Sequence, residues 1–155
     1  MPEKISKYFT LQEAIKSEKA EQLGLDNRPD DIETLNAIIQ TGHYMDEIRD
    51  YFNKPVYCSS WHRNKVVNKA VGGVDGSQHQ RGEAVDFGIA GMTPAEICLE
   101  LKPRMAEFHI DQLILEPSWV HVSFVTHPDN PRTSPRNQFI IDKRVRRVDI
   151  PKGLL

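Results

Sequence analysis

The 155-residue chain lacks several features that would assign a function at once. It has only two cysteines, Cys58 and Cys98, and neither has the CxxC spacing of a zinc or redox motif. We therefore expect both to be reduced core residues. No apolar run approaches the length of a transmembrane helix. The glycine-rich segment 72–82 has neither a P-loop lysine nor a GxGxxG pattern, which argues against a phosphate-binding loop.

The charge balance also excludes several classes of protein. The formal net charge is −2, with 27% charged and 39% hydrophobic residues, which is ordinary for a soluble globular protein. The basic cluster at 143–147 is short, and a solvated surface is its simpler interpretation. We expect no nucleic-acid partner, no membrane partner and a monomer. Residues 1–4 do not begin a signal peptide, so we expect synthesis in the cytoplasm.

Hydrophobic periodicity and turn residues predict a single α+β domain spanning residues 1–155. It would comprise N-terminal helices at 10–52, a metal-site core at 55–125, and a C-terminal loop and strand at 126–155. We expect a small, mostly antiparallel sheet that carries the site, with helices packed on one face. The predicted helices are 10–23, 30–52, 63–71 and one from 94, and the predicted strands are 56–59, 84–87, 112–116, 119–124 and 138–142.

Three local expectations can be tested against the structure. The Thr10 capping box should begin a helix that continues unbroken to Leu23. Gly42 should weaken or bend the long second helix. Residues 151–155 should be loosely held, because chain ends are poorly ordered unless something anchors them.

A histidine and an aspartate lie seven residues apart at the entrance to a short predicted strand. His79 belongs to a polar, glycine-flanked segment, and Asp86 lies within the apolar run 84–87. A buried carboxylate is unfavourable unless a partner compensates its charge. Zinc binds imidazole nitrogen and carboxylate oxygen, and a catalytic zinc site needs three protein ligands and one open position. His79 and Asp86 are therefore two candidate zinc ligands.

The third candidate ligand, His121, lies in the predicted strand 119–124. Side chains alternate along a strand, so His121 faces away from Val120 and Val122, and Asp86 faces away from its own apolar neighbours. If the two strands are neighbours in one sheet, Asp86 and His121 meet on the same side. The three residues then form one candidate metal site.

Each candidate ligand also has an ordinary structural interpretation. His79 could be a polar loop residue, Asp86 a carboxylate paired with Arg81 or Arg63, and His121 a strand histidine with satisfied hydrogen bonds. Taken singly, each of these is the simpler interpretation. Taken together, a His, an Asp and a His on converging elements favour a catalytic zinc site, which has three protein ligands.

With these residues in place, the sequence resembles the zinc D-alanyl-D-alanine carboxypeptidase family of peptidoglycan peptidases, which have the hedgehog/DD-peptidase fold. The segment 77–86, SQHQRGEAVD, is similar to the family pattern Ser-x-His-x-x-Gly-x-Ala-x-Asp, and residues 119–121, WVH, to its downstream strand. The resemblance covers the chain to about Phe124. The family's arginine, asparagine and Gly-Gly positions are matched by Arg63, Asn68, Gly72 and Gly73. The N-terminal segment 8–13 is similar to that of the phage-type branch of the family.

The resemblance implies Zn²⁺ held by His79, Asp86 and His121, with a peptidoglycan peptide as substrate. It also implies that Arg63 grips a substrate carboxylate or amide oxygen, and that Ser77 forms a hydrogen bond near the site. Many relatives carry an acidic general base three residues before the last histidine, where this chain has Ser118. Glu116, two residues earlier, is the candidate catalytic base.

Three functions remain to be compared. The first is a zinc peptidase, either a carboxypeptidase or an endolysin-type endopeptidase, that reaches the wall after release from the cell or on a virion. The second is a non-catalytic wall-binding or structural module that keeps zinc for stability, and Ser118 is the argument for it. The third, a two-metal phosphohydrolase, fits less well because such sites need more Asp and His residues.

Overall fold

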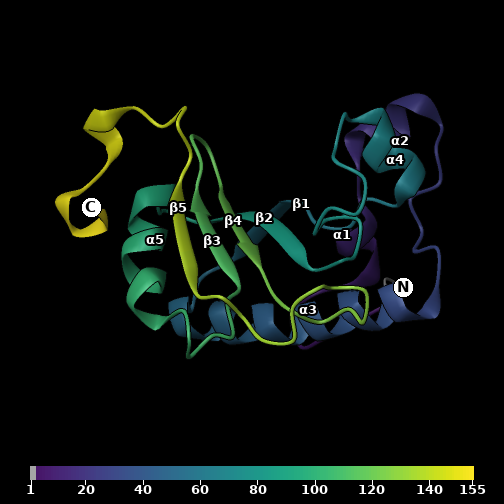
Figure 1. Cartoon of the computed structure of the whole chain (residues 1–155), viewed down its shortest axis with the longest axis horizontal. Helices are drawn as coiled ribbons and strands as arrows, with labels where there is room; N and C mark the ends of the chain where they lie inside the picture. The colour runs from purple at the N-terminus through teal and green to yellow at the C-terminus, as the bar shows by residue number, and fades with distance from the viewer. Residues whose placement is uncertain (1–2) are drawn as a thin grey trace.

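A five-stranded sheet runs through the protein, and its strands lie side by side in the order β1, β2, β4, β3, β5 (Figure 1). The structure is a computed structural model and describes residues 3–155. Its strands are β1 (Val56–Ser60), β2 (Ala84–Ile89), β3 (Gln112–Leu115), β4 (Val120–Ser123) and β5 (Gln138–Ile141). The β1–β2, β2–β4 and β3–β4 pairs are antiparallel, and only β3–β5 is parallel. The single-domain α+β prediction with a mostly antiparallel sheet is confirmed.

Two helices close one face of this sheet and bury its apolar side chains. The long helix α3 (Ile32–Phe52) runs beneath the strands, and α5 (Pro94–Leu101) lies beside β3 and β5 (Figure 1). The predicted alternation holds, because the side chains that face the helices are apolar and buried. The shared core contains Val85, Phe87, Val120, Val122, Leu113, Ile38, Met45, Ile48, Ile97 and Leu101.

The first predicted helix is two helices, α1 (Leu11–Ile15) and α2 (Glu18–Leu23). The Thr10 capping box is present, as expected, but Lys16 has extended backbone angles and ends α1. The Ser17 side chain then accepts a hydrogen bond from the backbone N–H of Ala20 and caps α2. A second N-cap within the run therefore breaks the helix that periodicity predicts as continuous. In Figure 1, α2 lies with α4 (Lys65–Ala70), away from the sheet.

Two glycines behave differently from the predictions. Helix α3 continues through Gly42, where an added Cβ would lie 3.3 Å from the side chains of Ile5 and Ser6. Gly42 therefore permits the N-terminal segment to pack closely on α3, and it does not interrupt the helix. Strand β2 continues past Gly88 to Ile89, because Gly88 pairs with Tyr57 of β1.

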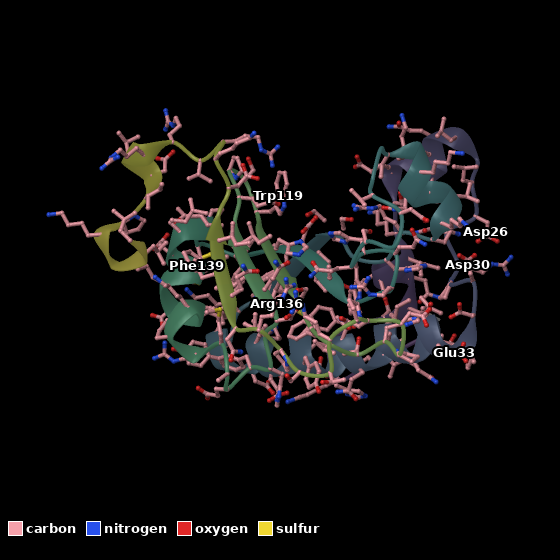
Figure 2. All side chains as sticks on the ribbon, viewed as in Figure 1. Asp26, Asp30, Glu33, Trp119, Arg136 and Phe139 are labelled. Atoms are coloured by element: carbon pink, nitrogen blue, oxygen red, sulfur yellow. The ribbon has the colours of Figure 1, made fainter. Side chains whose placement is uncertain are left out.

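The C-terminal segment is anchored at Arg136 and again at Leu154, so the expectation of a loose tail was wrong. In the loop before β5, the Arg136 guanidinium binds the buried carboxylate of Asp111, with two nitrogen–oxygen distances of 2.9 Å (Figure 2 labels Arg136). The chain continues through short 3₁₀ turns at η2 (Arg147–Asp149) and η3 (Lys152–Leu154); an earlier one, η1 (Lys102–Arg104), follows α5. Leu154 is buried against the α5 region. No helix within residues 3–155 is long and apolar enough to span a membrane.

Candidate metal centre

The register of β2 and β4 places Asp86 directly opposite His121. This is the arrangement that the alternation of side chains predicts. The Nδ1 atom of His121 lies 3.0 Å from Oδ1 of Asp86. Both side chains point away from the helix-covered face, so the sheet separates them from the apolar core. A one-residue slip of either strand would move its ligand to the other face.

His79 reaches the same carboxylate from the loop that precedes β2. Its backbone carbonyl accepts hydrogen bonds from the N–H groups of Arg63 and Gly82. Its Nδ1 lies 2.7 Å from the carbonyl oxygen of Trp61. These contacts direct Nε2 toward Asp86, and its distance to Oδ2 is 3.3 Å. His79 is buried, so the loop holds a ligand as completely shielded from water as those on the strands.

The hydrogen-bond partners of the two imidazoles fit a bound cation. The Trp61 carbonyl can only accept, so His79 carries its proton on Nδ1 and directs the lone pair of Nε2 at Asp86. The amide oxygen of Gln78 lies 2.9 Å from Nε2 of His121, which places that proton on Nε2 and the lone pair on Nδ1. Two lone pairs therefore face one carboxylate, an arrangement that needs a cation or additional protons between them.

The donor set also fits zinc in composition and size. One nitrogen from each histidine and one oxygen of Asp86 all lie within 4.8 Å of one another. Burial raises the pKa of Asp86, but the two imidazoles that face it, His121 and His79, outweigh burial and hold that pKa well below its usual range. The carboxylate is therefore ionised, as a metal ligand must be.

The ordinary pairings considered for Asp86 are not found. Arg81 instead pairs with Glu83, which is fully buried and accepts further hydrogen bonds from the backbone N–H groups of Thr126 and His127. Glu83 thereby ties the C-terminal side of β4 to the loop that carries His79. Arg63 has no carboxylate within 4.0 Å among residues 3–155, so Asp86 is left to the two histidines.

Glu116 follows β3 on the same face as His121. Its backbone N–H donates to the carbonyl of Trp119, which Figure 2 shows near the end of the sheet that carries the β3–β4 turn. Burial, followed by the negative charge of Asp86, raises the pKa of Glu116 above its ordinary value. Its Oε1 lies 3.6 Å from Nη2 of Arg144. Ser118, three residues before His121, is exposed.

Arg63 and Ser77 are joined through a buried asparagine rather than directly to the three candidate ligands. The Oδ1 atom of Asn68 accepts from Nε of Arg63 at 3.2 Å and from Oγ of Ser77 at 3.4 Å. Nη1 of Arg63 donates to Oγ of Ser60, also at 3.2 Å. Burial lowers the pKa of Arg63, although its guanidinium stays charged at any physiological pH. Arg63 therefore presents a half-buried cation that lacks an acidic partner in the described chain.

Two cavities are bordered by residues of the predicted site, although none of the three candidate ligands lines either of them. One of about 300 Å³ is bordered by Ser60 and Arg63, on the β1 side. A larger one, of about 590 Å³, is bordered by Glu116 and Arg144 and also by Pro94 at the start of α5.

Sequence reasoning missed two side chains near the site. Gln78 occupies a spacer position of the motif, yet it contacts His121 directly. His62, next to Arg63, is buried, and neither ring nitrogen has a hydrogen-bond partner among the described residues. The polar motif around Gln78 was the available signal; His62 had none, because its burial depends on packing with distant segments.

Comparison with known proteins places this geometry in a family. The family model described as Peptidase M15 matches residues 7–123. The chain belongs to the peptidase M15 family. The match includes all three candidate metal ligands, Glu116 and Arg63, and it ends at the last residue of β4. No curated protein matches the sequence. Membership of the M15 peptidase family identifies the chain as a hydrolase acting on peptide substrates, as the resemblance of its motifs predicted.

Proposed function

We propose that this M15 member is a zinc-dependent peptidase that hydrolyses peptide bonds in the stem peptides of bacterial peptidoglycan. The observation that carries the proposal is the convergence of His79, Asp86 and His121, with their ligand atoms within 4.8 Å of one another. All ligands, together with Glu116 and Arg63, come from one chain. A monomer therefore suffices for the reaction.

The side chains divide the chemistry among them. His79, Asp86 and His121 would hold zinc, which when bound supplies Lewis acidity and makes water reactive near neutral pH. Glu116 accepts a proton from the attacking water and returns it to the leaving amine. Its raised pKa favours the first of these transfers, because the carboxylate of a weaker acid is a stronger base. Arg63 binds a carboxylate or amide oxygen of the substrate through its planar fork.

The position of the scissile bond within the substrate distinguishes two kinds of peptidase. A D-Ala-D-Ala carboxypeptidase would place the terminal carboxylate of the substrate on Arg63. An endolysin-type endopeptidase would bind a peptide that continues on both sides of the scissile bond. Mass spectrometry of the products separates the two, since the first releases free D-alanine and the second releases peptide fragments.

A second candidate is a wall-binding module on the same fold that keeps zinc for stability. Two observations favour it, the serine at position 118 and the proximity of Arg144 to Glu116. An arginine beside a carboxylate stabilises its charged form and weakens it as a base. The two candidates differ in turnover and agree in metal content.

The test combines metal analysis with hydrolysis of purified peptidoglycan by wild-type protein and the Glu116→Gln variant. We expect about one zinc per chain in both, and chelator-sensitive product release by the wild type only. The variant should lose about 100-fold or more in kcat, the usual contribution of a general base. Zinc without hydrolysis in the wild type would favour the binding module, and a wild type without zinc would refute the metal centre.

A further inference from the structure

A chain of three glutamine side chains leads away from the candidate ligand His121. Nε2 of His121 lies 2.9 Å from Oε1 of Gln78. Nε2 of Gln78 donates to Oε1 of Gln112 at 3.0 Å. Nε2 of Gln112 in turn donates to Oε1 of Gln138 at 2.6 Å. The chain thus connects the metal centre to three separate segments, the loop before β2, the start of β3 and the start of β5.

The order of donors and acceptors along this chain determines which nitrogen of His121 carries the proton. Gln78 uses its NH₂ group on Gln112, so it offers only its oxygen to His121, and Nε2 must donate. If all three amides were reversed, Gln78 would present NH₂ to Nε2. The proton would then lie on Nδ1, the nitrogen that faces Asp86, and no lone pair would point at the metal position.

The backbone supports the chain at its far end. Gln112 and Gln138 are register partners in the parallel β3–β5 pair, so their side chains lie on the same face as His121. Strand β5 lies outside the segment 7–123 that matches the family model. The last glutamine therefore comes from a part of the protein that the family core does not include.

We propose that Gln78, Gln112 and Gln138 are positioning residues that hold His121 with Nδ1 directed at the metal. Strand β5 then contributes to the metal centre through side chains rather than through a ligand. This inference rests on the proposed metal site. Metal-bound histidines depend on the partner of their other nitrogen, and removing such a partner reduces metal affinity or activity by about 10–100-fold.

The test removes the amides one at a time with Gln→Met, which keeps the length of the side chain. Gln78→Met should weaken zinc binding about tenfold or more. Gln112→Met should have a smaller effect, and Gln138→Met the smallest, because Gln138 is exposed and two bonds further from the ring. Gln40→Met is the matched control, since Gln40 is exposed on α3 and its side chain has no hydrogen bond within residues 3–155.

Two further readouts separate positioning from a general loss of structure. In the zinc-loaded wild type, long-range ¹⁵N NMR should show a protonated Nε2 and a metal-bound Nδ1 on His121, and Gln78→Met should shift the Nε2 signal. Gln78→Glu, which retains an acceptor, should keep zinc affinity at or above that of the wild type. Thermal unfolding of each metal-free variant verifies that it is folded.

The outcomes are distinct from those that test the peptidase. Zinc binding by the wild type, with Gln78→Met unchanged in affinity and in the His121 signals, would overturn the positioning role alone. Equal losses in Gln78→Met and Gln78→Glu would also overturn it, because they would indicate a packing effect. A wild type that binds no zinc would overturn the metal centre and this inference with it. A zinc-binding wild type without hydrolysis would refute only the peptidase.

Discussion

The two halves of the candidate metal centre are built by different kinds of interaction. Asp86 and His121 stand opposite each other on β2 and β4, and backbone ladders on both sides fix their positions. His79 lies on a loop that has no ladder. A few buried side chains hold that loop, chiefly Asn68, whose NH₂ group donates to the carbonyl of Val74 and to Gln80. The backbone hydrogen bonds of the sheet therefore fix the strand half, whereas individual side-chain hydrogen bonds fix the loop half.

The largest effect is expected where the two halves meet, at Asp86. Its two oxygens contact one histidine from each half, at 3.0 Å and 3.3 Å. Asp86→Ala removes one ligand and leaves two imidazoles without the anion that faces them. We expect loss of stoichiometric zinc and of all hydrolysis, measured by metal analysis after gel filtration. Glu33→Gln, an exposed change on α3, is the control and should retain both. Full zinc content in Asp86→Ala would remove Asp86 from the site.

The next effect is expected at the junction of loop and strand, at Gly82. Gly82 has φ +74°, and an added Cβ would lie 2.6 Å from Cγ1 of Ile38 in α3. Gly82→Ala therefore combines backbone strain with overpacking of the core. We expect the free energy of unfolding to fall by about 2–5 kcal/mol, summing about 1–2 for strain and about 1–3 for overpacking. Urea denaturation measures it.

The chain offers a matched control for this change. Gly76 also has φ +74°, but nothing lies within 4 Å of its Cβ position. Gly76→Ala should show the strain alone, about 1–2 kcal/mol. Equal losses at the two glycines would contradict the packing of the loop against α3.

A smaller effect, confined to the loop half, is expected for Asn68→Ala. The change removes the donor from Asn68 to the carbonyl of Val74, which keeps its hydrogen bond from the N–H of Ser77, and it leaves Nε of Arg63 without its acceptor. Leaving a half-buried donor unsatisfied destabilises by about 1–3 kcal/mol. Amide hydrogen exchange should become faster across residues 74–80 and stay unchanged in β2 and β4. Faster exchange in both halves would show that the halves are one cooperative unit.

The same division explains how much of the site the sequence predicts. Asp86 and His121 follow from alternation, because a strand has only two faces and the apolar residues occupy one of them. Their pairing required only that β2 and β4 be neighbours. His79 was placed by its motif, but its contact with Trp61, and the contact of Gln78 with His121, involve side-chain directions that alternation does not encode. The roles of Glu116 and Arg63 stay predictions, although the structure places both beside the cavities.

Long-range packing accounts for the remaining differences. Strand β5 was predicted as a strand, but its parallel pairing with β3 depends on where the loop at 127–136 returns the chain. The burial of Leu154 depends on the α5 surface, more than 40 residues earlier in the chain, so the local sequence of the tail carried no sign of it. The break at Lys16 was local, and Ser17 as a second N-cap was a signal that the apolar stripe obscured.

The smallest effect concerns the acid sensitivity of the loop half. Burial lowers the pKa of His62 to about 4, from an ordinary value near 6.5. The unfolded chain therefore binds a proton at this position between pH 6.5 and pH 4, and the folded chain does not. Stability from the neutral ring is present above pH 6.5 and is lost as the pH falls toward 4, by about 1–2 kcal/mol at pH 5.

Replacing the ring by an apolar side chain should remove this dependence. We expect metal-free His62→Leu to lose less stability than metal-free wild type between pH 7 and pH 5, as measured by urea denaturation at each pH. His43→Leu, at a ring that is 54% exposed, is the control for replacing a histidine by leucine. The backbone of His62 bonds to Ala14 and Asn27 at the base of the loop half. If His62→Leu and wild type lose the same stability, the acid sensitivity originates in other groups, and the loop half is no more sensitive to acid than the strands.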